Sequence, residues 1–214
     1  MKAFHKKIIK EVSLKTLLVS SLFFVAIFAF AFLAHEIVGE KEDMFDTKVF
    51  HFLKAHTTAP LVTLMHALSF FGSHYFLIPV YILMVIFLFF RHRNSDAINI
   101  IVIVLSSTAL LFGLKTIYRR HRPEFPLLRE FHNYSFPSGH ALSSFILCSI
   151  LFYLIWKSHL RPVLKYLWAG LLFIFSISIG ISRIVLRYHF ASDVLAGFAL
   201  GFACVIFSFW ILKK

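Results

Sequence analysis

The sequence predicts an all-α polytopic membrane protein with six transmembrane helices and short interfacial helices between the first two. The chain is 59% hydrophobic and contains 28 Phe, whereas an average soluble domain is roughly 45–50% apolar. Its apolar runs approach the ~20 helical residues needed to cross a hydrocarbon layer about 30 Å thick. Charged residues gather in the breaks between these runs. We therefore expect one membrane-embedded domain spanning residues 1–214.

Six apolar runs between charged breaks define the expected spans. They cover residues 16–35, 74–90, 97–117, 138–156, 163–182 and 191–212. The breaks are a lysine-rich start, turns at 91–96 and 157–165, and Lys213-Lys214 at the end. The first apolar run exceeds the usual 7–15 apolar residues of a signal peptide, so no cleavable signal is expected. Cys148 and Cys204 fall inside spans and are expected to act as buried small hydrophobes.

The stretch 36–73 differs because its apolar residues recur at helical spacing among charged ones. Asp46 is a plausible cap for a first short helix, and Pro60 precedes a second. Helices lying in the membrane interface fit this pattern. A seventh, poorly formed span is the weaker alternative, because Lys48 and Lys54 interrupt the stretch.

The distribution of basic residues predicts the orientation. The two termini and the 91–96 and 157–165 turns hold twelve Lys and Arg but only two acids, Glu11 and Asp96. The opposite side holds ten Lys and Arg and eight acids. The positive-inside rule therefore places both termini in the cytoplasm. The net charge of +12 reflects this orientation and anionic lipid headgroups, and nucleic-acid binding is not expected.

Three segments carry the residues that we expect to be functional. The first is Lys115, six residues, then Arg122-Pro123; the second is Pro137-Ser138-Gly139-His140. The third is Ser182-Arg183, five residues, His189, three residues, Asp193. All three fall at the outer ends of the expected spans, although the orientation was assigned without them. Each cation alone would more often be an interfacial anchor, but their convergence at one membrane depth favours a shared site.

These residue types suit phosphoryl transfer, in which charge develops on the phosphate oxygens. Lys115, Arg122 and Arg183 supply fixed positive charge, and each arginine can hold two oxygens. Ser138 can cap the helix that begins there, and the exposed N–H groups of that helix favour an anion. Gly139 lets the backbone approach a phosphate closely.

Two histidines remain for the nucleophile and the acid. His189 lies four residues before Asp193, so on a helix the two share a face. A carboxylate that holds one imidazole nitrogen leaves the other free to attack. His140 has no carboxylate in its own segment and is better suited to protonate the leaving oxygen.

The three segments resemble the signature motifs of the type 2 phosphatidic acid phosphatase superfamily, which includes vanadium haloperoxidases. The resemblance covers about 80 residues, Lys115 to Asp193, with no motif position missing. It implies a phosphohistidine on His189 oriented by Asp193, with His140 as general acid. It also implies phosphate binding without a metal or other cofactor, by Lys115, Arg122, Ser138, Gly139 and Arg183.

The membrane spans and the small size resemble the bacterial lipid phosphatases of this superfamily. The resemblance implies hydrolysis of a terminal lipid phosphate at the outer face of a bacterial inner (plasma) membrane. Undecaprenyl diphosphate and phosphatidylglycerophosphate are about equally favoured as the substrate, and lipid A is the third candidate. Phosphotransfer to another lipid is an alternative reaction, and an anionic-lipid transporter or binding protein is the non-enzyme alternative. The sequence leaves the oligomeric state open.

Other polar residues near the motifs and between the first two spans have plainer interpretations. Solvated interfacial charge is the favoured interpretation for Arg119, Arg120, His121 and Arg187, with substrate contact as the alternative. A plain loop is favoured over a pocket mouth for His132, Asn133 and Tyr134. A metal cluster is disfavoured for His51, His56, His66 and His74, whose spacing is irregular and lacks a paired carboxylate.

Overall fold

The computed structural model is an all-helical bundle, and it describes residues 14–39, 44–128 and 133–211. Six of its helices are long and apolar enough to cross a membrane, which confirms the predicted fold class. The candidate spanning helices are α2 (Leu14–Gly39), α5 (His74–Phe90, within the apolar stretch Ala59–Phe90), α6 (Asn94–Tyr118), α7 (Gly139–Trp156), α8 (Pro162–Val185) and α9 (Ala191–Ile211). The basic residues expected at both termini, Lys2 to Lys10 and Lys213-Lys214, lie outside the described residues.

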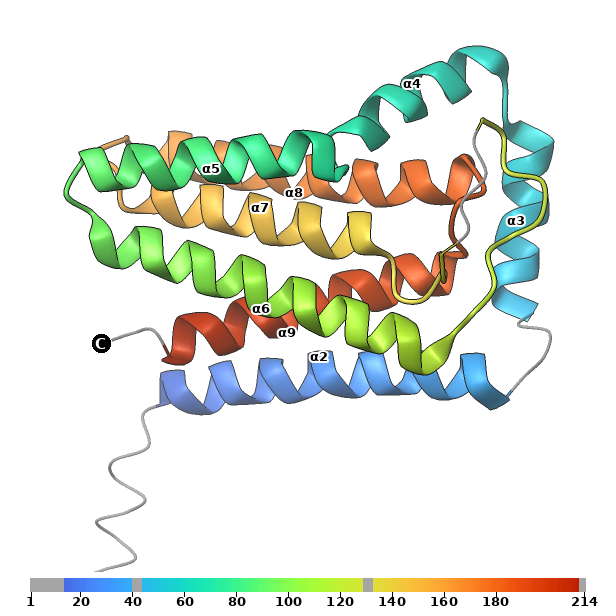
Figure 1. Cartoon of the computed structure of the whole chain (residues 1–214), viewed down its shortest axis with the longest axis horizontal. Coiled ribbons are helices and arrows are strands. Elements are labelled where there is room, and N and C mark those ends of the chain that lie inside the picture. Colours follow the sequence, from blue (N-terminus) through green and yellow to red (C-terminus); the bar gives the residue numbers. More distant parts are fainter. Residues whose placement is uncertain (1–13, 40–43, 129–132, 212–214) are drawn as a thin grey trace, which may run out of the picture.

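Two shorter helices connect the first two spans. Helix α3 (Met44–His56) lies across one end of the bundle, and α4 (Ala59–Phe70) slants toward the start of α5 (Figure 1). The crosswise position of α3 fits the interfacial helix that the sequence favoured over a seventh span. Hydropathy alone joins α4 and α5 into one apolar stretch, Ala59–Phe90. The placement of both helices in the membrane interface stays a prediction.

The hydrophobic core lies between α7 and α9 and extends to α2 and α6. Leu142, Ile146 and Ile150 of α7 are almost fully buried against Ala196 and Leu200 of α9. Many large apolar side chains on the outer surfaces of the helices are instead exposed. Lipid tails would cover such surfaces, so the outward apolar side chains follow from the membrane environment. Cys148 and Cys204 are free thiols in this interior or beside it.

A close approach between α7 and α9 brings two of the motifs together. The Ser138 N–H donates to the Asp193 carbonyl over 3.0 Å. Gly197, one helical turn further along α9, lies so near that an added Cβ would sit 2.6 Å from the Ser138 carbonyl oxygen. The absence of a side chain at Gly197 therefore permits the contact that sets the start of α7 against the start of α9.

At the opposite end of the bundle, a separate polar cluster closes the turns. Asp96, in the first turn of α6, accepts from Tyr153 over 2.8 Å and from Lys157 over 3.0 Å. Arg93 pairs with the same carboxylate. These contacts join α6 to the end of α7.

Candidate active site

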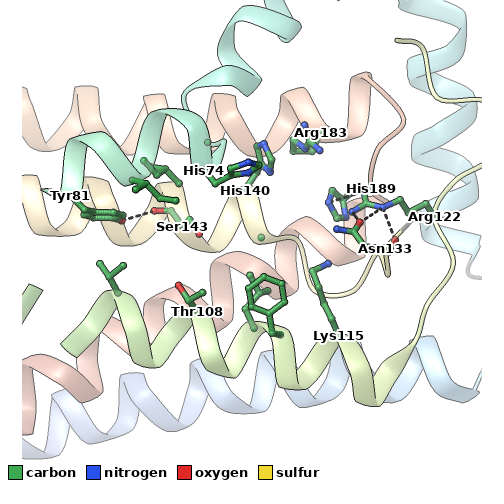
Figure 2. A pocket seen from close by; sticks show the side chains of 17 residues that line it. His74, Tyr81, Thr108, Lys115, Arg122, Asn133, His140, Ser143, Arg183 and His189 are labelled. Atoms are coloured by element: carbon green, nitrogen blue, oxygen red, sulfur yellow. Dashed lines mark hydrogen bonds between the residues drawn. The ribbon is translucent and has the colours of Figure 1, made fainter. Parts of the chain in front are cut away.

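A cavity of about 550 Å³ opens among α5, α6, α7 and α8 near the end of the bundle where α3 lies (Figure 2). One part of its wall is polar and contains residues of all three motifs: Lys115, Arg122, Gly139, His140, Arg183 and His189. The rest is mainly apolar, with Leu77 and Ile78 from α5 facing Leu111 and Phe112 from α6. The cavity therefore joins a cationic end to an apolar chamber.

His189 lies in the turn just before α9 and is 3% exposed. Its Nδ1 lies 3.4 Å from Oδ2 of Asp193 and 3.2 Å from the Ser135 hydroxyl. Its Nε2 lies 3.2 Å from Nη1 of Arg122. The sequence placed His189 and Asp193 on one helix face; the contact is confirmed, although the helix begins two residues after the histidine.

The surroundings of His189 favour the neutral imidazole. Burial lowers the pKa of His189 well below its usual 6.5, and the positive charges of Arg122, Arg183 and Lys115 lower it further. Burial also lowers the pKa of Arg122 to about 10, although Asp193 opposes that shift. At neutral pH an unprotonated imidazole therefore faces a charged guanidinium.

Lys115 and Arg122 are held by oxygens from the loop before α7 and, for Arg122, also from the turn before α9. Lys115, in the last turn of α6, donates to the carbonyls of Tyr134 and Ser135 over 2.6 and 3.2 Å. Arg122 donates to the Asn133 side-chain oxygen over 2.6 Å and to the Tyr188 carbonyl over 2.5 Å. Both cations are thus held in place before any anion enters.

Arg183, the third cation, lies near the end of α8 and is 2% exposed. Its Nη1 donates to the Ser69 hydroxyl of α4 over 2.5 Å, and its guanidinium lies 4.4 Å from the centre of the Tyr188 ring. Helix α4 therefore contributes to the site although it carries none of the motifs.

Ser138 is placed differently from the other motif residues. It caps α7, because its hydroxyl accepts from the Ala141 N–H over 3.5 Å, as the sequence predicted. It is fully buried and does not line the cavity, whereas the next residue, Gly139, does. Asp193 also lies behind the wall, in contact with His189. A phosphate contact from Ser138 stays a prediction.

The structure corrects two of the plainer interpretations. Arg120 was expected to be solvated, but its side chain is 15% exposed and forms ion pairs with Asp46 and Asp193. Asn133 was expected in a plain loop, but it lines the cavity and holds Arg122. Arg119 is exposed, as expected of an interfacial charge. His132 lies outside the described residues.

Some site residues carried no usable sequence signal. Ser135 lies two positions before Pro137, and this closeness to a motif is the only sequence feature that could have indicated a role in the site. The sequence predicts Asp46 as a cap of its own helix, but its carboxylate reaches the start of α9, where it accepts from the Ser192 N–H. His74 lines the cavity near His140 (Figure 2). Within the described part of the chain, no three His, Cys, Asp or Glu side chains gather as metal ligands.

Comparison with known proteins places this geometry in a family. Residues 96–214 match the family model of the PAP2 superfamily. The chain is 32% identical over 143 residues to phosphatidylglycerophosphatase B of Bacillus subtilis, covering 64% of this chain and 68% of that protein. It is 29% identical over 173 residues to undecaprenyl-diphosphatase of Sulfolobus acidocaldarius, covering 77% of each chain.

Two crystal structures resemble the whole bundle. A transmembrane PAP2 type phosphatidylglycerolphosphate phosphatase from Bacillus subtilis superimposes with a TM-score of 0.78 at 26% identity, covering 91% of this chain and 94% of that one. LpxE of Aquifex aeolicus gives a TM-score of 0.61 at 26% identity, covering 80% and 98%. The chain therefore belongs to the PAP2 superfamily, the type 2 phosphatidic acid phosphatases, as one of its multi-pass membrane lipid phosphatases.

Proposed function

We propose that this protein hydrolyses the terminal phosphate of a lipid phosphate or diphosphate through a phosphohistidine on His189, at the outer face of a bacterial inner membrane. The observation that carries the proposal is that Lys115, Arg122 and Arg183 line the same cavity as His140 and His189, and that this cavity continues into an apolar chamber. A phosphate headgroup fits the cationic end, and a lipid tail fits the apolar part. The lysine and arginine distribution supports the outer face and cytoplasmic termini.

The first step is attack by Nε2 of His189 on phosphorus. A P–N bond forms while the bond from phosphorus to the lipid oxygen breaks, and His140 gives its proton to that oxygen. Lys115, Arg122 and Arg183 stabilise the charge on the remaining phosphate oxygens. Asp193 accepts from Nδ1 and supports the positive charge that the imidazole acquires.

The second step is hydrolysis of the phosphohistidine. Water attacks phosphorus, His140 takes the water proton, and the P–N bond breaks with its electron pair returning to Nε2. Inorganic phosphate leaves and both histidines regain their starting protonation. Because three side-chain cations already supply positive charge, we propose that the reaction requires no metal ion.

Phosphatidylglycerophosphate and undecaprenyl diphosphate are the two substrates that the relatives' names favour. The name phosphatidylglycerophosphatase B indicates phosphatidylglycerophosphate, and the name undecaprenyl-diphosphatase indicates undecaprenyl diphosphate. Both lipids carry a terminal phosphate and a long apolar tail. A cavity with a cationic end and an apolar chamber suits either lipid.

Phosphate release by purified protein tests the proposal. The protein is incubated with phosphatidylglycerophosphate, undecaprenyl diphosphate and lipid A, and free phosphate is measured beside His189→Ala and His66→Ala. His66 is exposed on α4, outside the cavity, so its variant is a matched control. We expect wild type and His66→Ala to release phosphate and His189→Ala to release none. Wild-type turnover in His189→Ala would refute the nucleophile.

The alternatives give different products in the same experiment. A phosphorylated lipid acceptor without free phosphate would indicate phosphotransfer. Binding of the lipids without any turnover by the wild-type protein would indicate a transporter or a binding protein.

A further inference from the structure

Arg120 forms a buried bridge between two carboxylates. Its Nη1 donates to Oδ1 of Asp193 and its Nη2 to Oδ2 of Asp46, each over 2.7 Å. The side chains of Asp46 and Asp193 are 3% and 0% exposed. The guanidinium also lies 4.2 Å from the centre of the Phe190 ring. Arg120 is therefore fixed on three sides.

Asp46 anchors this bridge from a different part of the chain. It lies in the first turn of α3, and its Oδ1 accepts from the Ser192 N–H over 2.8 Å. Its Oδ2 also accepts from the Ser192 hydroxyl. A carboxylate at the start of a helix is stabilised by the N–H groups there. Asp46 therefore holds both the start of α9 and the guanidinium that reaches Asp193.

The contacts of Asp193 divide between its two oxygens. Arg120 occupies Oδ1, whereas the Phe190 N–H donates to Oδ2 over 2.9 Å and the Ser135 hydroxyl donates to the same oxygen. This arrangement fixes the carboxylate plane and leaves Oδ2 toward Nδ1 of His189. Burial alone would lower the pKa of Arg120, but Asp193 and Asp46 raise it, so the bridge stays charged.

We propose that Arg120 is a positioning residue for the phosphatase reaction, which it supports by holding Asp193 toward His189, with Asp46 as its anchor. This inference rests on the proposed roles of His189 and Asp193. Arg120 does not line the cavity, so it acts through Asp193 and not on the lipid. Losing it would leave two buried carboxylates with no cation between them, a costly arrangement.

The test is a double-mutant cycle in the full-length protein, measured as phosphate release from phosphatidylglycerophosphate. Arg120→Met is made in wild type and in Asp193→Ala. We expect kcat to fall about 10- to 100-fold in the wild-type background, as for outer partners of an oriented histidine, with KM unchanged. In the Asp193→Ala background, the further effect should stay within about twofold.

Matched variants separate positioning from a general loss of charge or fold. Arg119→Met removes a neighbouring positive charge that is exposed, and it should leave kcat unchanged. Arg120→Lys keeps one charge and should recover part of the lost rate. Asp46→Asn is close in shape and should lower kcat several-fold, since it weakens the anchor without touching Asp193 directly. It replaces Arg120→Met if that variant does not yield folded protein.

The outcomes also distinguish this inference from the proposed function. Additive losses in Arg120→Met and Asp193→Ala, a raised KM alone, or wild-type kcat in Asp46→Asn would each overturn the positioning role. Wild-type turnover in His189→Ala would instead overturn the underlying mechanism. Loss of turnover in His189→Ala together with full activity in Arg120→Met would remove only the inference about Arg120.

Discussion

Arg122 Nη1 lies 3.2 Å from Nε2 of His189, on the cavity side of the imidazole. A guanidinium N–H can only donate, so Nε2 must present its lone pair and Nδ1 must carry the ring proton. That proton points to Asp193 and Ser135. This tautomer puts the Nε2 lone pair on the cavity side, where the phosphorus of an entering phosphate would have to take the place of the Arg122 N–H.

Replacing Arg122 with lysine tests whether the site needs the several hydrogen bonds of the guanidinium group as well as its charge. Arg122→Lys keeps the charge but loses the simultaneous contacts to Asn133 and Tyr188. We expect kcat/KM for lipid phosphate release to fall on the order of 10²–10³, as when an oxyanion donor is removed. Arg91→Lys, an exposed change at the opposite end of the bundle, is the control. Equal activity in Arg122→Lys and wild type would show that the hydrogen bonds specific to the guanidinium group are not needed.

If His189 is the nucleophile, as proposed, the pH profile of kcat/KM should report its protonation. Protonation removes the lone pair of Nε2, and the pKa of His189 is lowered well below 6.5 by burial and by the nearby cations. Activity through this group should therefore persist as the pH falls through 6.5 and be lost only at lower pH. Arg122→Met removes one of these cations, which raises the pKa and should move the acid limb to higher pH. An acid limb at the same pH in Arg122→Met and wild type would contradict the effect of Arg122 on the pKa of His189.

Ser135 is expected to contribute to the orientation of His189. Its hydroxyl donates to Asp193 and lies 3.2 Å from Nδ1 of His189. A hydrogen bond to a charged group is worth roughly 1.5–3 kcal/mol, so Ser135→Ala should lower kcat about 10- to 100-fold. Ser176→Ala removes an equally buried hydroxyl from α8, outside this cavity, and should leave kcat unchanged. Matching rates for the two variants would show that the Ser135 hydroxyl is dispensable.

Gly197 should tolerate no side chain. An added Cβ would lie 2.6 Å from the Ser138 carbonyl oxygen, whereas at Gly113 it would meet nothing within 4 Å. Overpacking costs typically about 1–3 kcal/mol, so Gly197→Ala should lower the thermal unfolding midpoint of the purified protein. Gly113→Ala, also within a helix, should not lower it. Equal midpoints would mean that α7 and α9 separate easily.

Chelation and vanadate test the proposed absence of a metal requirement. Turnover should survive EDTA, because Lys115, Arg122 and Arg183 supply the positive charge. Vanadate mimics five-coordinate phosphorus and should inhibit by occupying the same end of the cavity. Loss of phosphate release in EDTA that added Mg²⁺ restores would refute this proposal.

The sequence was sufficient to predict the parts of the fold that depend on local patterns. Charged breaks and apolar runs gave the six spans, because hydrophobic length and loop charge are properties of contiguous residues. The position of the motifs at the outer ends of the expected spans likewise predicted that Lys115, Arg122, His140, Arg183 and His189 would lie close together, and all five line one cavity.

The supporting contacts could not be predicted because they join distant segments. Asp46 and Arg120 are 74 positions apart, and Arg183 and Ser69 are 114 apart. Nothing in the local sequence around Asp46 distinguishes a carboxylate that caps its own helix from one that reaches another. Such pairs depend on how α3 and α4 pack against α8 and α9, which periodicity does not specify.

The polar and apolar parts of the cavity wall come from different stretches of the sequence. The cations and histidines proposed to react come from residues 115–189, whereas α5 and the part of α6 before Lys115 supply most of the apolar lining. If the proposed function holds, substitutions in α5 should change which lipid tail is accepted without changing the reaction. A chimaera that receives residues 74–90 from a relative should adopt that relative's lipid preference at an unchanged chemical rate.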